Sequence, residues 1–423
     1  MDALEILQAT TSRPLNWVSP RNGADVHPLG YVLGGTLKVQ GATLTVPAGA
    51  VVAGNHFGGL VVEGGHLDDS AGGAVFTNIA DPALGLLSCD SACDLGTPDL
   101  GGISVTASST AKGTATIVGA TFRHFHEWLN LSGGAVSGPT DVRYGFVVKD
   151  SLFDGVLLSS SGTTDVERCH FLRTGLQVAG VNLVDSTFDG SPLLGGITIH
   201  GGGSTATVER NLIDTAGAMG PVAIDHVSSL DFRNNTFTNS GAAPTTDPVV
   251  TVASSTADLS SAFSGTTSNG TAGDSVGLGD VTAPLSFRWQ TPTKGTSARP
   301  LGFVINRGNL FMGPGATLTV PASGIVKVGN GGITLQGGAL DASAGGAVFT
   351  SLYDPNFGPS LCPGPACGQH AAPGDWAGIQ SMSGPGAIVL RGALLQFGYY
   401  PVFVTSGQAT VVCSTFAGKS PFS

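Results

Sequence analysis

Acidic and basic side chains recur beside large apolar residues in the middle of the chain. Five short units, KDSLFDG, ERCHFLRTG, VDSTFDG, ERNLIDTAG and FRNNTFTNSG, lie between residues 149 and 241. If these units stack as neighbouring strands, about 4.8 Å apart, carboxylates beside the apolar residue can bind calcium or act as an acid and base pair on a sugar polymer. The candidate catalytic residues are Asp150, Asp154, Asp185, Asp189, Asp214, Arg168 and Arg210.

The simpler interpretation of these side chains is that they are solvated charges at turns. Asp is a common turn residue, and both Asp154 and Asp189 precede a Gly. We favour this interpretation. The chain also lacks a nucleophile elbow, a zinc-protease motif, a phosphate loop or a dinucleotide fingerprint in its required setting.

A second group of candidates is the stretch RHFHEW, residues 123–128. On a strand, His124 and His126 share one face, so the two imidazoles could bind the same ligand. A related stretch, QFGYY at residues 396–400, has no His but keeps aromatic residues. Aromatic rings beside polar groups can stack on sugars, which makes His124, His126, Trp128, Tyr399 and Tyr400 candidate ligand-binding residues. Packing in the core or at a coil edge is the alternative, and we favour it.

The five units define two columns of residues that must position these side chains. The large apolar residues are Phe153, Phe171, Phe188, Ile213 and Phe237, and small or polar residues stand two positions before them: Ser151, Cys169, Ser186, Asn211 and Asn235. Residues two apart on a strand share a face, so we expect both columns to point inward. Hydrogen bonds from coil to coil would then satisfy the polar column. The Gly that ends each unit is expected to supply a positive φ. This spacing is typical of a solenoid.

The chain also contains a long duplication. The string SAGGAVFT begins at Ser70 and again at Ser343, and GATLTVPA begins at Gly41 and again at Gly315. We predict a first module over residues 1–240 that starts inside a module, inter-module coils rich in Ser, Thr and Gly over 241–283, and a truncated second module over 284–423. The chain is thus expected to hold about one and a half modules and to be part of a longer array.

Composition favours an all-β protein and excludes several function classes. Only 11% of residues are charged, whereas about a quarter is usual, and 65 residues are Gly. The net charge of −11 and the scattered Lys and Arg argue against nucleic-acid binding. No apolar run approaches the roughly 18 residues of a membrane span. The first residues, MDALEILQATTSRP, do not resemble a signal peptide, so an export signal is not present in this chain.

Four of the six Cys residues form two close pairs, Cys89 with Cys93 and Cys362 with Cys367, at matching places in the duplication. We interpret each pair as a disulfide that closes a loop, which indicates an oxidising compartment. A thiolate metal site is the alternative, but no second Cys or His pair lies at zinc spacing. We therefore predict no metal at these residues, and no cofactor, with calcium as the one ion to consider.

The Phe/Ile and Asn/Ser columns resemble the right-handed parallel β-helix of the pectin-lyase-like superfamily. The segments GATLTVPAGAVV and GGLVVEGGHLDDSAGGAVFT are similar to the start of β-helix modules in bacterial secreted and surface proteins. The resemblance implies an all-β, right-handed parallel β-helix solenoid, and it leaves function open because this fold carries enzymes, adhesins and spacers.

We expect a structural or adhesive rod, secreted or at the cell surface, that binds glycans or a surface partner on its lateral face. Tandem duplication favours this role, because arrays extend reach and multiply weak binding. The alternative is a polysaccharide lyase or glycoside hydrolase that acts on an acidic polysaccharide through the Asp column.

Overall fold

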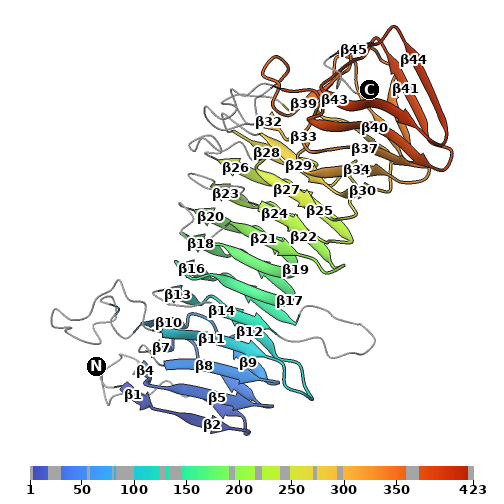
Figure 1. Ribbon diagram of the computed structural model, residues 1–423. Helices are drawn as coiled ribbons and strands as arrows, with labels where there is room; N and C mark the ends of the chain where they lie inside the picture. Colours follow the sequence, from blue (N-terminus) through green and yellow to red (C-terminus); the bar gives the residue numbers. More distant parts are fainter. Residues whose placement is uncertain are drawn as a thin grey trace. The chain divides into compact units, whose positions relative to one another are not determined.

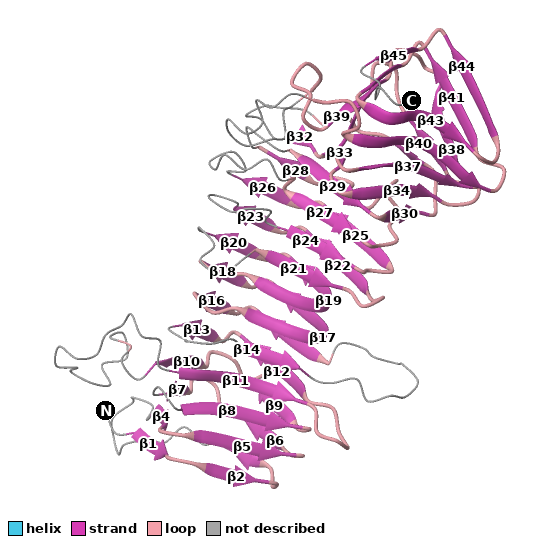
Figure 2. Ribbon diagram, in the orientation of Figure 1, coloured by secondary structure: helices cyan, strands magenta, loops and turns pink. Residues whose placement is uncertain are grey.

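The computed structural model describes residues 3–17, 30–54, 58–78, 81, 100–123, 129–132, 145–189, 196–214, 222–238, 248–269, 274–292, 299–358 and 371–417. These residues contain strands and turns but no helix (Figure 2). They fall into two compact units, Met1–Ile199 and His200–Ser423. The predicted module boundaries at residues 240 and 284 remain predictions.

Each coil of the first unit contributes one strand to each of three faces, and strands of successive coils pair in parallel (Figure 1). The first face consists of β1 (Ala3–Ile6), β4 (Gly30–Leu33), β7 (Val51–Gly54), β10 (Val75–Asn78), β13 (Thr121–Arg123), β16 (Leu152–Asp154), β18 (His170–Leu172) and β20 (Thr187–Asp189).

The second face consists of β2 (Ala9–Thr11), β5 (Thr36–Gln40), β8 (Gly58–Glu63), β11 (Leu100–Thr106), β14 (Leu129–Ser132), the first parts of β17 (Leu158–Glu167) and β19 (Leu176–Val184), and β21 (Ile197–His200). The third face consists of β3 (Leu15–Asn16), β6 (Thr43–Thr45), β9 (His66–Asp69), β12 (Thr114–Val118), β15 (Phe146–Lys149) and the second parts of β17 and β19. The chain is therefore a parallel β-helix, as the sequence predicts.

The second unit continues the same design with one exception. It contains β22 (Thr205–Glu209), β23 (Leu212–Asp214), β24 (Val222–Asp225), β25 (Ser229–Arg233), β26 (Thr236–Thr238), β27 (Val250–Ala253), β28 (Thr267–Ser268), β29 (Ser275–Gly279), β30 (Val281–Ala283), β31 (Phe287–Arg288) and β32 (Arg299–Pro300). Only β28 and β32 pair antiparallel among its described strand pairs.

The remaining strands of the second unit also pair in parallel. They are β33 (Gly302–Ile305), β34 (Gly308–Met312), β35 (Thr317–Thr319), β36 (Ile325–Val328), β37 (Gly331–Gln336), β38 (Ala339–Ala342), β39 (Val348–Ser351), β40 (Trp376–Ser383), β41 (Ala387–Arg391), β42 (Leu394–Gln396), β43 (Gly398–Val404), β44 (Gln408–Val412) and β45 (Thr415–Ala417).

The strand order of β4 to β16 recurs in β33 to β45, which gives the duplicated sequence the same backbone twice. Gly102 in β11 has φ 100° and Gly378 in β40 has φ 105°, and both lie where the strand pairing shifts register. A Cβ atom at Gly378 would lie 1.6 Å from the carbonyl oxygen of Tyr400, so no side chain fits there. The duplication therefore preserves a backbone feature that only Gly allows.

Both predicted columns point inward. The anchor residues are almost fully buried, and within the first unit Phe76, Phe122, Phe153, Phe171 and Phe188 stack with ring centroids 4.5–5.0 Å apart. Such aromatic pairs are worth about 0.5–1.5 kcal/mol each beyond their burial. The stack makes each coil depend on its neighbours.

The small polar column satisfies the backbone between coils, as predicted. Ser151 Oγ accepts from the Ala120 amide at 3.2 Å, and Ser186 Oγ accepts from the Cys169 amide at 3.1 Å. In the second unit, Asn235 Oδ1 accepts from both the amide and the side-chain nitrogen of Asn211, each at 3.0 Å. Buried polar side chains thus close hydrogen bonds that strand pairing alone leaves open.

The predicted positive φ at the closing Gly holds at one of the two such residues that the structure describes; Gly190, Gly217 and Gly241 lie outside the described residues. Gly155 has a positive φ of 69°, as expected, but in the next unit Arg173 takes this role with φ 55°, and Gly175 does not have a positive φ. A second left-handed residue precedes every polar-column residue: Asp150, Arg168, Asp185, Arg210 and Asn234, with φ from 50° to 56°. Most of the candidate charged residues are therefore fixed at turns.

Candidate functional site

The predicted acidic column is built on the turn between the third and first faces of the first unit. Lys149 pairs in register with Glu167, and Glu167 with Val184, so the next residues, Asp150, Arg168 and Asp185, follow one another on successive coils. An arginine therefore stands between the two aspartates. Carboxylates on adjacent coils, which a calcium site or an acid and base pair would need, do not meet at this turn.

Arg168 and Asp150 form a two-point ion pair across the coils. Arg168 Nε lies 2.6 Å from Asp150 Oδ1, and Nη2 lies 2.9 Å from Oδ2. The hydrogen bonds from Arg168 hold the pKa of Asp150 below its ordinary value. Both side chains are about half exposed, so the ion pair adds little to the free energy of unfolding. It favours the ionised form of the Asp150 carboxylate, and both oxygens of that carboxylate contact Arg168.

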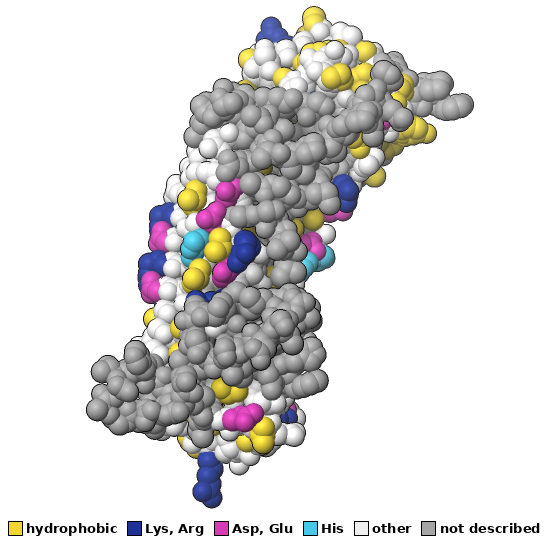
Figure 3. Space-filling model, turned by 90° about the vertical axis from the view of Figure 1, so that its left-hand side faces the viewer, with side chains coloured by type: hydrophobic (Ala, Val, Ile, Leu, Met, Phe, Trp, Pro, Cys, Tyr) yellow, Lys and Arg dark blue, Asp and Glu magenta, His cyan; other side chains and the backbone are white. Residues whose placement is uncertain are grey.

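The neighbouring charges extend this pair into a network. Arg168 Nη1 lies 3.0 Å from Glu167 Oε2, and Lys149 Nζ lies 3.0 Å from the same oxygen. Lys149 also reaches Asp165 Oδ2 at 3.1 Å. On the face drawn in Figure 3, basic and acidic side chains likewise lie beside one another. Opposite charges thus offset each other locally.

The other predicted residues are also drawn into local pairs. Arg173 donates to Asp154, and Asp189 lies 3.9 Å from His170 Nε2. Arg210 contacts Glu209 at 2.8 Å in the second unit, where Asp214 ends β23. In the first unit, Asp154 and Asp189 share a register position, but Leu172 of the coil between them separates the two carboxylates. Among the described residues, these two carboxylates therefore do not meet on adjacent coils.

Several predicted residues lie outside the described part of the chain. These are His124, His126 and Trp128, and the paired cysteines Cys89, Cys93, Cys362 and Cys367. Two other cysteines are described and free: Cys413 is exposed, whereas burial raises the pKa of the Cys169 thiol to about 12. The latter is a packing residue, because a reactive thiol needs a low pKa.

Tyr399 and Tyr400 lie on β43 and form an exposed aromatic cluster with Phe403. Their exposed fractions are 42% and 43%, and that of Phe403 is 41%. The rings of Tyr399 and Tyr400 meet edge to face at 4.5 Å, and Tyr400 lies 5.8 Å from Phe403. The sequence pointed to the two tyrosines; it did not single out Phe403, which alternation with Val402 and Val404 could have placed on a surface.

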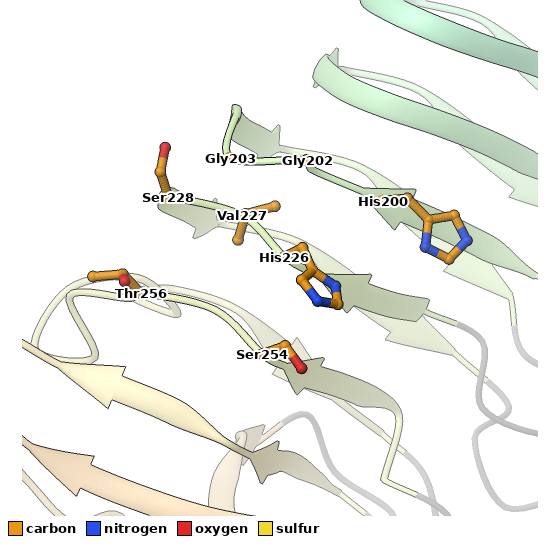
Figure 4. Close-up of a pocket in the computed structure, with 8 residues that line it drawn as sticks. All are labelled: His200, Gly202, Gly203, His226, Val227, Ser228, Ser254 and Thr256. Atoms are coloured by element: carbon orange, nitrogen blue, oxygen red, sulfur yellow. The ribbon is translucent and has the colours of Figure 1, made fainter.

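Sequence reasoning also missed two histidines of the second unit. His200 ends β21 and His226 follows β24, and a hollow of about 590 Å³ lies beside them (Figure 4). The signal was present in the strings ITIH and AIDH, each of which ends an alternating strand. The coil alignment on large apolar residues did not reach these strand ends.

Comparison of the chain with protein-family models, with curated proteins and with solved structures gives no match. In the described ranges, no cluster of three or more His, Cys, Asp or Glu side chains is arranged to hold a metal ion. The described part of the chain also contains no helix of the length and apolarity that a membrane span requires.

Proposed function

We propose that the protein is a structural or adhesive β-helix of the secreted or cell-surface type, related to the pectin-lyase-like superfamily. The alternation of Asp150, Arg168 and Asp185 along one turn carries this proposal. A lyase or hydrolase needs carboxylates free to take or give a proton at a common point. Here Arg168 lies between the two aspartates and forms an ion pair with Asp150. An ion-paired carboxylate suits a solvated surface better than proton transfer in catalysis.

The contact surface of this proposal is the aromatic cluster of Tyr399, Tyr400 and Phe403. Exposed rings with a phenolic hydroxyl at one end suit sugar rings, which present apolar faces and polar edges. No charged residue occurs between Arg391 and Lys419, so the surrounding surface favours neutral glycans over strongly acidic ones. Repetition of such a surface in an array would multiply weak contacts.

The test combines a turnover screen with a binding screen on the purified chain. The chain is incubated with acidic and neutral polysaccharides, with and without calcium, while unsaturated products and reducing ends are followed. No turnover is expected on any substrate. Turnover that Asp150→Ala or Asp185→Ala abolishes would overturn the proposal in favour of the enzyme.

The binding arm uses a glycan array and paired variants. Tyr399→Ala and Tyr400→Ala should each weaken binding to the same glycans, because each removes a stacking ring. Val412→Ala is the matched control, since it shortens another exposed side chain of the same coil. Equal binding by all three variants and the unmodified chain would remove the aromatic cluster from the proposal.

A further inference from the structure

Two imidazoles of the second unit lie on neighbouring coils beside the hollow shown in Figure 4. The Gly201 amide donates to the Asp225 carbonyl oxygen at 2.6 Å, which places the residue after His200 next to the coil that carries His226. Both histidines are exposed. The hollow exists because Gly202 and Gly203 carry no side chain, and Ser254 and Thr256 add only short ones.

His226 is oriented by its neighbour in sequence. Its Nδ1 lies 2.7 Å from Asp225 Oδ2, so the carboxylate engages this ring nitrogen. The other ring nitrogen, Nε2, is left for a ligand. Metal-binding histidines are oriented in this way by carboxylates that bond to the other ring nitrogen.

The charge of the Asp225 carboxylate is only partly offset by its neighbours. Its Oδ1 is buried and has no hydrogen-bond partner among the described residues, and no described Lys or Arg forms an ion pair with it. No basic residue other than the two histidines lines the hollow. An acidic side chain beside His226, with no Lys or Arg lining the hollow, favours a cation in the hollow over an anion.

We propose that this hollow binds a divalent transition metal of the zinc class through His226 Nε2 and the imidazole of His200. Asp225 orients His226 and offsets the charge of the ion, and water fills the remaining positions in the space left by Gly202 and Gly203. Imidazole nitrogen is a preferred ligand of zinc and copper. With two protein ligands in place of the three or four of most zinc sites, the metal is expected to exchange readily.

The experiment titrates the purified, metal-free chain with Zn²⁺ alone by calorimetry at neutral pH, and repeats the titration with His226→Ala, His200→Ala and Asp225→Asn. Either histidine variant should lose the site. Asp225→Asn should weaken the affinity by about 10- to 100-fold, the usual effect of removing the partner of a ligating histidine. Cu²⁺ bound to the unmodified chain should show coupling to two imidazole nitrogens by electron paramagnetic resonance.

The matched control is His170→Ala, because His170 is also exposed and also lies near an aspartate, Asp189 at 3.9 Å. This control should bind Zn²⁺ like the unmodified chain. A double variant at His124 and His126 should do the same. Binding that persists in the His200 and His226 variants, or that disappears only in the His124 and His126 variant, would overturn the inference.

Discussion

Asp69 lies in the apolar interior of the first unit, in a column that the next described coils fill with apolar residues. It pairs in register with Ile117, which pairs with Val148, and all three side chains are fully buried. Both carboxylate oxygens lack a hydrogen-bond partner among the described residues. The corresponding residue of the second copy is Ala342, also fully buried. The first copy therefore carries a carboxyl group where the second has a methyl group.

Burial, with a smaller effect of the Asp68 charge, raises the pKa of Asp69 to about 8. In the unfolded chain this carboxyl titrates near pH 4. Between these values the folded chain keeps the proton and the unfolded chain loses it, so stability must fall as pH rises. The slope is about 1.4 kcal/mol per pH unit, on the order of 5 kcal/mol over the whole window, and it ends above the folded pKa.

The assay is urea unfolding from pH 4.5 to 9, with the free energy of Asp69→Ala compared with that of the unmodified chain at each pH. The difference should be small at pH 4.5, should grow steadily in favour of Asp69→Ala, and should level off above pH 8. The reciprocal change, Ala342→Asp, should create the same pH dependence in the second copy. Equal free-energy differences at all pH values would refute the reasoning, because the carboxyl would then be solvated or paired in the folded chain.

Three further predictions follow from the fold. Phe171→Ala removes the ring between two stacked neighbours and should cost about 3–5 kcal/mol in urea unfolding, with Phe171→Leu costing less. Gly378→Ala should prevent folding or sharply lower the soluble yield, whereas Gly315→Ala, with φ 77° and open space at Cβ, should cost about 1 kcal/mol. Arg168→Ala should leave stability almost unchanged but raise the pKa of Asp150 toward its ordinary value, as measured by NMR titration; an unchanged pKa would contradict the ion pair.

The inward columns could be predicted because they depend only on period-two alternation and on the recurrence of Phe beside a small polar residue. Ser151 and Asn235 were placed correctly for that reason. The outward site could not be predicted in the same way, because its chemistry depends on contacts between side chains of neighbouring coils. The aligned units already place Asp150, Arg168 and Asp185 at one position, three residues before each anchor Phe; the structure adds that Arg168 pairs with Asp150 through both carboxylate oxygens.

Asp69 shows a second limit of sequence reasoning. The string HLDDS contains two adjacent aspartates, and alternation from the apolar Leu67 turns Asp69 inward, where a charged side chain is not expected. In the structure Asp68 is half-buried and accepts from the Ser70 amide at 3.1 Å, as turn aspartates do, while Asp69 takes the inward position. The mismatch with Ala342 in the second copy was visible, but its meaning required the pairing of β9 with β12.

The two copies also reveal what the fold retains when side chains change. Thr77 donates to Asp81 at 2.8 Å, and the equivalent Thr350 donates to Asp354 at 2.6 Å, so both copies keep a buried aspartate at the same place after the strand. The positive charge near it comes from different residues in the two copies. In the first copy Arg123, on the following coil, lies 2.6 Å from Asp81 Oδ2.

The second copy has Gln396 at the place of Arg123, and the preceding coil supplies Lys327 instead. Its Nζ donates to the carbonyl oxygen of Asp354 at 2.7 Å, and its side chain is fully buried. The basic side chain beside the buried aspartate thus contacts its carboxylate in the first copy and its backbone carbonyl in the second. Retention of the aspartate although its basic neighbour differs indicates that this segment is kept for its backbone position.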